Sequence, residues 1–543
     1  MIFRRDSKAQ ASEESSGTRL PNAPAIRPVL ADYVGQRFVD RNRRKLLWIF
    51  GGVILFYGMA FGVLSSFLLP PLIAPLAIMA LMVIWLLPDS EHNPSETMAS
   101  FLFAYLIALL VWPDYLALQI PGLPWISAIR LVGIPMVVML VICLSVSKRF
   151  RDELKGVMEA VPILWKSVAI FAVIGLISVG FSHDIGSSIS KLIVAILYWF
   201  SMFFIALHVF RVPGRIEKMM LYLWVILIFD CGIALWEGYL HAVPWAGHIP
   251  SLLQVQDPVI LRILANHARA ASGVYRIQGK FTTMLGLAEL IGMTAPIVVY
   301  QLFNAKHWTL KLASFLSLPI IFMTVLGTDS RLAMISFGLS FFIYLLVWSL
   351  QHWRKRKDSI AGPALILTYP FLAAALIVAS FTVTRVHNAV WGDGAAQAST
   401  EARQLQMQMG LPKVISHPWG HGIGMGAQTL GYADQSGLLT IDSYFLSLGL
   451  EYGVIGFAVF MTMFLSAMVY AALALAFSKD EEMQYMAPLS ISLANFLISK
   501  SILSQQDNHS LAFILLGAVG AMYYRYKKEG KNPVVAIPNP ANP

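Results

Sequence analysis

Apolar stretches long enough to cross a lipid bilayer recur along this chain from Leu46 to Tyr524. The composition agrees, because 57% of the 543 residues are hydrophobic and only 13% are charged, against roughly 25% charged in an ordinary soluble domain. One aqueous core cannot hide that much apolar surface, so most of it must face lipid. The sequence therefore predicts a polytopic membrane protein of the all-α class.

Hydropathy predicts a transmembrane helical bundle over residues 46–526 with about fourteen spans. The expected spans are 46–66, 68–87, 98–112, 126–146, 161–181, 189–209, 219–240, 282–303, 312–328, 331–350, 361–381, 452–477, 486–504 and 511–526. We expect cytoplasmic tails at 1–45 and 527–543. The first tail is polar and lacks the apolar core and cleavage site of a secretory signal, so we expect it to be retained and largely disordered.

The net charge of +10 does not indicate nucleic-acid binding, because Lys and Arg gather in short linkers between apolar spans. Such clusters are typical of cytoplasmic loops. They lie at 41–45, 148–151, 211–218, 354–357 and 525–528. This topology places both termini inside the cell. It turns two long loops, 241–281 and 382–451, toward the outside, where we expect short surface helices near 257–267 and 399–415.

Three arginines lie on the outer side, where the tendency of positive charge to stay inside does not explain them. Arg276 precedes a span, Arg331 follows Asp329 at a tight turn, and Arg403 lies on the second surface helix. Guanidinium groups bind phosphate oxygens with a fixed two-pronged geometry. The alternative is local pairing with a carboxylate such as Asp329 or Glu401.

A glycine-rich segment from Ser416 to Gly426 carries four glycines at alternate positions, which permits close backbone approach and exposed amide groups. Its spacing is not that of a nucleotide phosphate loop. Two outer carboxylates, Asp442 and Glu451, follow it, and an unpaired carboxylate there is costly. These two carboxylates, with further charged residues in the outer parts of the spans, either line a charged cavity or form structural ion pairs. Those further charges are Asp230, Glu237, Glu289 and Lys500.

In order and topology these pieces resemble the O-antigen ligase/polymerase superfamily of bacterial glycosyltransferases. The matching segments are 276–281, 329–331, 401–403, 417–424, 442–444 and 451–456. The resemblance implies an outward-facing membrane enzyme that uses glycans linked through diphosphate to undecaprenol. It implies that neither a metal nor another cofactor is needed.

By this resemblance Arg276 and Arg403 bind the lipid diphosphate, and Arg331 is a third candidate. Asp442 or Glu451 accepts a proton from the attacking sugar hydroxyl, and His417 either assists or only shapes its loop. The remaining expected substrate contacts are Lys280, Gly422, Gly424 and Tyr444. Ligases of this family commonly carry a His-Asn pair where this chain has Asp442 and Ser443, which favours a polymerase.

The sequence thus predicts a polymerase that joins undecaprenyl-diphosphate-linked repeat units of a surface or secreted polysaccharide. It would act at the periplasmic face of the bacterial inner membrane, in contact with membrane lipid, and a chain-length regulator is a plausible partner. One alternative is an O-antigen ligase that transfers the glycan to another acceptor. A second, of a different class, is a flippase or exporter of lipid-linked sugars, although such carriers usually show repeated halves and mid-membrane charges.

Overall fold

The computed structural model describes residues 78–87, 94–118, 126–253, 275–384, 397–434, 437–478 and 480–531, with a few isolated positions besides. The chain divides into two compact units, Met1–Pro88 and Asp89–Pro543. In the first unit the longest described stretch, 78–87, is mainly helical. All features discussed below belong to the second unit.

Helices make up nearly all regular structure of the second unit, and the described residues contain isolated bridges but no strand. The helices are α2 (Ser95–Val111), α3 (Ala128–Val146), α4 (Lys148–Ala160), α5 (Pro162–Ser178), α6 (Ile185–Ala195), α7 (Ser201–Val209), α8 (Arg215–Leu240), α10 (Met284–Asn304), α11 (Trp308–Gly327), α12 (Arg331–Lys355), α13 (Ala361–Thr382), α15 (Gln397–Ser416), α16 (Gly426–Leu430), α17 (Tyr444–Phe477), α18 (Met486–Lys500) and α19 (His509–Lys531). A π-helical turn, η3 (Ile196–Phe200), joins α6 to α7.

Among the described residues, nine helices are long and apolar enough to cross a membrane. The all-α, multi-span class is therefore confirmed. The count of about fourteen spans stays a prediction, since most of the expected span 46–66 and half of the expected span 68–87 lie outside the described residues. The surface helix expected near 399–415 is present as α15, whereas the one near 257–267 falls almost entirely outside the described residues.

One expected boundary is wrong in a way that matters for function. The last long loop was expected to run to residue 451, but α17 begins at Tyr444, where Ser443 caps it by accepting a hydrogen bond from the amide of Leu446. The helix then bends at Gly453, whose φ of 71° lies in the left-handed region. The expected span start at 452 therefore marks the bend, and Glu451 lies on the helix before it.

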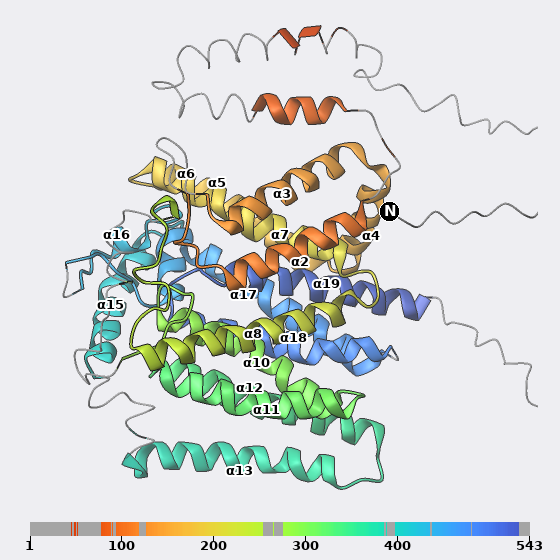
Figure 1. Ribbon diagram of the computed structural model, residues 1–543, viewed down its shortest axis with the longest axis vertical. Coiled ribbons are helices and arrows are strands. Elements are labelled where there is room, and N and C mark those ends of the chain that lie inside the picture. Colours follow the sequence, from red (N-terminus) through yellow and green to blue (C-terminus); the bar gives the residue numbers. More distant parts are fainter. Residues whose placement is uncertain are drawn as a thin grey trace, which may run out of the picture. The chain divides into compact units, whose positions relative to one another are not determined.

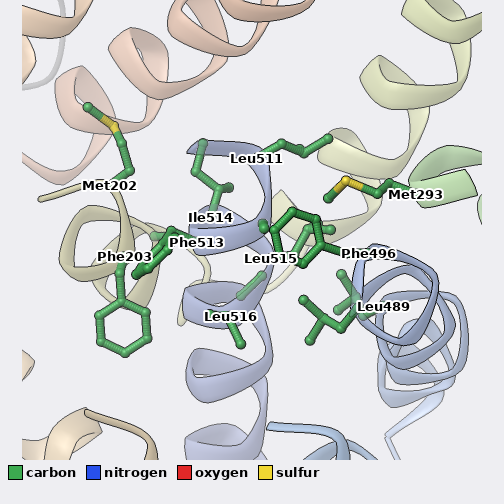
Figure 2. Close-up of a cluster of buried hydrophobic side chains, with 14 of the residues drawn as sticks. Met202, Phe203, Met293, Leu489, Phe496, Leu511, Phe513, Ile514, Leu515 and Leu516 are labelled. Atoms are coloured by element: carbon green, nitrogen blue, oxygen red, sulfur yellow. The ribbon is translucent and has the colours of Figure 1, made fainter. Parts of the chain in front are cut away.

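The C-terminal helix α19 is at the centre of the largest apolar core. Figure 2 shows Phe513 and Ile514 of α19 near Met202 and Phe203, and Phe496 of α18 on the other side of the same helix. All of these side chains are buried. This packing fixes the short segment 501–508, which joins α18 to α19, against the rest of the bundle.

The short elements α15 and α16 lie together at one end of the long helices, and α15 runs across the helix ends rather than along them (Figure 1). Contacts of both with α17 hold them there. Helix α4, with its basic residues, lies toward the opposite end (Figure 1). The candidate site is at the end that carries α15 and α16.

Candidate functional site

The turn between α11 and α12 holds the first of the expected arginines. The guanidinium of Arg276 donates to the carbonyl oxygens of Thr328 at 3.0 Å and Asp329 at 3.1 Å. Its Nε also lies 3.9 Å from the Asp329 carboxylate. Asp329 takes a left-handed φ of 45°, which is uncommon for a residue other than glycine. Arg276 therefore binds the C-terminal carbonyls of α11 and stabilises this turn.

The other two arginines approach each other across α12 and α15. Arg331 is the first residue of α12, and its Nη2 lies 3.5 Å from the hydroxyl of Thr400 on α15. Arg403, one turn further along α15, is close enough for the charge of Arg331 to act on it. The structure thus brings two cations together, although like charges repel. An anion bound between them would relieve that repulsion.

Asp442 balances part of this positive charge. Its Oδ2 lies 3.8 Å from Nε of Arg403, and its backbone amide donates to the side-chain oxygen of Gln406 at 2.8 Å. Within the described residues the Nε of Arg403 has no hydrogen-bond acceptor at normal distance. Burial raises the pKa of the Asp442 carboxyl, and Arg403 and Gln406 oppose that rise. Arg403 is therefore held mainly by the charge of Asp442 rather than by a hydrogen bond of its Nε.

The glycine-rich segment packs directly on the bend of α17. The carbonyl of Pro418 accepts from the amide of Val454 at 3.1 Å, and the amide of His421 donates to the carbonyl of Leu450 at 2.8 Å. A methyl group added at Gly453 would lie 1.9 Å from the Pro418 oxygen. Only glycine fits this contact, since the backbone is also in the left-handed region there.

Glu451 fixes the second half of the glycine-rich segment. One carboxylate oxygen accepts from the amide of Gly424 at 2.9 Å, and the other accepts from Ser447 at 2.8 Å and from the amide of Gly426 at 3.3 Å. The side chain is buried, at 5% exposure. Both oxygens are engaged by donors within the protein, so Glu451 holds the loop in place.

A cavity of about 540 Å³ adjoins this loop. Its charged lining comes from five helices or helix junctions and was not apparent from the local sequence. The charged residues are Asp114, Arg130, Lys191, Glu451 and Asp507. Gly424 lines the same cavity, as do several Ser and Gln side chains of the segment 504–510. Ile441 also lines it, and the next residue, Asp442, contacts Arg403. The arginines and the cavity are therefore adjacent.

Part of the region just described matches a known protein family. Residues 312–461 match a family model described as O-antigen ligase. This segment belongs to the O-antigen ligase/polymerase superfamily. No curated protein matches the chain. The family implies a multi-pass membrane enzyme of the glycosyltransferase type.

The O-antigen ligase domain contains most of the site residues expected from the sequence, but the site extends beyond its matched segment. Arg331, Arg403 and Asp442 lie inside 312–461, as do Gly422, Gly424, His417 and Glu451. Arg276 lies before it, and so do Lys191 and the other cavity residues of the first half. Asp507 follows it. The family match alone would have missed most of the cavity wall, since only five of its 19 lining residues lie within 312–461.

Two residues that were expected to contact the substrate, one inside this domain and one before it, do not line the cavity. Tyr444 is completely buried and lies edge-on to His509 with ring centroids 4.7 Å apart. Lys280 is buried too, and its ammonium donates to the carbonyl of Leu109. Neither residue lines the cavity. The structure therefore supports a packing role for Tyr444 and an internal tether for Lys280 rather than the expected contacts.

His417 and Gly422 remain on the glycine-rich segment. His417 is exposed, and its ring Nδ1 lies 3.0 Å from the hydroxyl of the neighbouring Ser416. Its ring is 4.7 Å from that of His421. Gly422 has a φ of 106° and packs against Ser182, where a methyl group would approach to 2.6 Å. These contacts indicate a loop-shaping role, and neither residue lines the cavity.

The other outer charges form internal pairs. Lys500 and Glu289 are both fully buried and lie 2.8 Å apart, and the side-chain amide of Asn508 donates to the same carboxylate. Glu237 accepts hydrogen bonds from Tyr275 and from the amides of Gln278 and Gly279. For these residues the alternative of structural pairing is the one observed. Asp230 differs, because it is buried and its carboxylate oxygens have no hydrogen-bond partner among the described residues, although the charge of Lys280 acts on it.

The described residues contain no group of three or more His, Cys, Asp or Glu side chains that could hold a metal ion. What the sequence reasoning missed was the pair Lys191 and Asp507. Lys191 lies on a helix expected to span the membrane, and a lysine within such a span is a recognised signal of function. Asp507 carried no signal, because it follows the end of one span and only the fold brings it to the cavity.

Proposed function

We propose that the protein polymerises undecaprenyl-diphosphate-linked oligosaccharide units, with Arg403 and Arg331 binding the diphosphate. The observation that carries this proposal is the approach of these two arginines beside a polar cavity. Arg276 positions them indirectly, by stabilising the turn from which Arg331 emerges. This differs from the sequence-based expectation, in which Arg276 bound the diphosphate itself.

Physical chemistry favours this use of the cations. When a sugar leaves a lipid diphosphate, the electron pair of the breaking bond stays on the diphosphate oxygen, so negative charge grows there. Preorganised cations aimed at that oxygen stabilise the transition state more than the ground state. Removing one donor of this kind costs about 3–4 kcal/mol in barrier, which is roughly a hundredfold to a thousandfold in rate. No metal or nucleotide is needed for this stabilisation.

The orientation follows from the distribution of charge. The basic linkers, including 211–218 and 354–357, lie at the ends of α8 and α12 that face away from the arginine site. Since such clusters remain in the cytoplasm, we assign the arginine site to the periplasmic face of the inner membrane. The same orientation assigns the segments before 46 and after 526 to the cytoplasm.

Substitution of Arg403 tests the function. In the native host we expect Arg403→Ala to abolish long polymer and Arg403→Lys to restore little of it, because an ammonium lacks the two-pronged geometry. Arg356→Ala is the matched control, since Arg356 is exposed at the far end of α12. Normal-length polymer from Arg403→Ala, at normal protein level, would overturn the proposal.

A ligase-type transfer is the second candidate, favoured by the description of the matched family. Deletion separates the two functions. A strain without a polymerase accumulates single lipid-linked units, whereas a strain without a ligase accumulates long lipid-linked chains. Labelling of single cysteines introduced at Ser416 and Lys357 tests the orientation: an impermeant reagent added outside spheroplasts should reach only position 416.

A further inference from the structure

Three carboxylates line the cavity, from Asp114, Glu451 and Asp507, and the contacts of Glu451 and Asp507 differ sharply. Glu451 already accepts hydrogen bonds at both oxygens from Gly424, Gly426 and Ser447. These three bonds occupy most of the roughly four acceptor positions of a carboxylate, and protonation of Glu451 would weaken the charge-assisted bonds that hold the loop. Glu451 is therefore poorly placed to act as a base.

Asp507 differs from Glu451 in each of these respects. It lies on the short segment between α18 and α19 and lines the cavity. Its side chain stays accessible from the cavity, and no hydrogen bond or ion pair to another described residue engages its carboxylate. The fold holds it in position, because the flanking Asn508 donates to the carbonyl of Gly286 and to Glu289.

The charges around Asp507 come from five separate elements. They are Lys280 before α10, Lys500 of α18, Lys191 of α6, Asp114 after α2 and Glu289 of α10. Although the side chain opens to the cavity, the dense protein around it keeps the carboxyl away from bulk water, which raises the pKa of Asp507 above its ordinary value. Lys280, Lys500 and Lys191 oppose that rise. A raised pKa makes a carboxylate a better proton acceptor near neutral pH.

The rest of the cavity suits a saccharide. The π-helical turn η3 presents Tyr198 and Trp199 to it, and such turns are frequent at functional sites. Gln505, Gln506 and Ser510 add neutral hydrogen-bonding groups. The volume of about 540 Å³ lies within the roughly 300–1,000 Å³ typical of small-ligand sites. This combination of aromatic rings, amides and hydroxyls fits the end of a hydroxyl-rich glycan.

We propose that this cavity binds the acceptor sugar and that Asp507 is the general base that removes the proton from its attacking hydroxyl. The inference rests on the proposed function. In the reaction the acceptor oxygen forms a bond to the anomeric carbon of the donor and its proton passes to Asp507. The bond from that carbon to the diphosphate oxygen breaks, and the electron pair leaves with the lipid diphosphate toward Arg403 and Arg331. Protonated Asp507 then releases its proton to water.

The geometry connects the two halves of this reaction. Ile441 lines the cavity, and its carbonyl accepts a hydrogen bond from Ser504, three residues before Asp507. The next residue along the chain, Asp442, contacts Arg403. The segment 441–442 thus contacts both the cavity wall and Arg403, so the cavity that holds the base lies beside the proposed diphosphate site.

The test uses the full-length protein in membranes of the deletion strain, supplied with the lipid-linked glycan that this strain accumulates. General-base catalysis contributes roughly 100-fold to 10,000-fold to a rate. We therefore expect Asp507→Asn to lower kcat at least 100-fold and to leave the KM for the lipid-linked donor near the native value. Asp507→Glu, which keeps a carboxylate, should recover part of the rate and shift the acidic limb of the pH profile.

The controls separate this inference from the proposed function. Asp358→Asn removes an exposed carboxylate at the other end of the bundle and should leave the rate unchanged. Arg403→Ala should raise the KM for the donor, which Asp507→Asn should not. If Asp507→Asn retains the native kcat while Arg403→Ala is inactive, the base assignment is overturned and the function stands. If both variants are fully active, the function itself falls. If Asp507→Asn fails to fold, the rate and pH profile of Asp507→Glu test the assignment instead. A native rate and a native pH profile in Asp507→Glu would overturn it.

Discussion

The anchoring role of Glu451 gives the sharpest prediction about how the glycine-rich loop is held. Glu451→Gln replaces one carboxylate oxygen by an amide group that cannot accept a hydrogen bond. If the remaining oxygen stays with Ser447 and Gly426, the new amide faces the backbone N–H of Gly424, which is 2.9 Å away from the native oxygen. One buried bond is lost and two donors then point at each other.

The magnitude follows from these contacts. A hydrogen bond to a charged acceptor contributes roughly 1.5–3 kcal/mol, and a buried donor left without a partner costs about 1–3 kcal/mol. We therefore expect Glu451→Gln to destabilise the loop by about 3 kcal/mol. Ser447→Ala removes one donor and leaves both oxygens bonded to backbone amides, so its cost should be only about 1 kcal/mol.

Hydrogen exchange in detergent measures the effect where it occurs. In Glu451→Gln, amides over 420–426 should exchange on the order of a hundredfold faster, since 1.4 kcal/mol corresponds to a factor of ten in an equilibrium constant. Amides of α19 should exchange at the native rate. Native exchange over 420–426 in a variant that has lost transfer activity would refute the reasoning, because Glu451 would then take part in the chemistry instead of holding the loop.

Three further predictions concern stability, each measured as the thermal unfolding midpoint of the purified protein. Gly453→Ala should be severely destabilising, because the added methyl group would clash with the Pro418 carbonyl. Gly431→Ala should lower the free energy of unfolding by only about 1–2 kcal/mol, because its backbone is left-handed (φ 73°) but no atom lies near the added methyl group. Equal losses of stability in the two variants would contradict this. Lys500→Met should cost about 3–5 kcal/mol by leaving the buried Glu289 carboxylate without its counter-cation, and the double variant Glu289→Leu/Lys500→Met should recover most of that cost. No recovery would show that the pair is not the cause. The surrounding protein raises the pKa of Asp507. The native protein should therefore lose stability as pH rises from the ordinary Asp range through that raised pKa, and Asp507→Asn should show no such loss. An Asp507→Asn variant that is less stable than the native protein at neutral pH would contradict this.

The sequence could predict those parts of the site that depend on local pattern. The arginines and the glycine-rich segment stand outside the apolar runs or at their ends, and their residue types carry a definite chemistry wherever the chain places them. The sequence could not separate roles that depend on a side chain's neighbours. Arg276 and Arg403 were equivalent in the sequence, but the first donates to the carbonyls of a helix end, whereas the Nε of the second lies 3.8 Å from the Asp442 carboxylate.

By itself the sequence determined the membrane environment and the helical class, because apolar runs of bilayer length leave no other way to satisfy the backbone hydrogen bonds. It also determined which end of the bundle carries the cationic site, through the basic linkers at the opposite end. Only the tertiary structure decided which carboxylate is free to react. Glu451 and Asp507 are 56 residues apart, and whether each meets a donor or an open cavity depends on how α17, α18 and α19 pack, which no local pattern encodes.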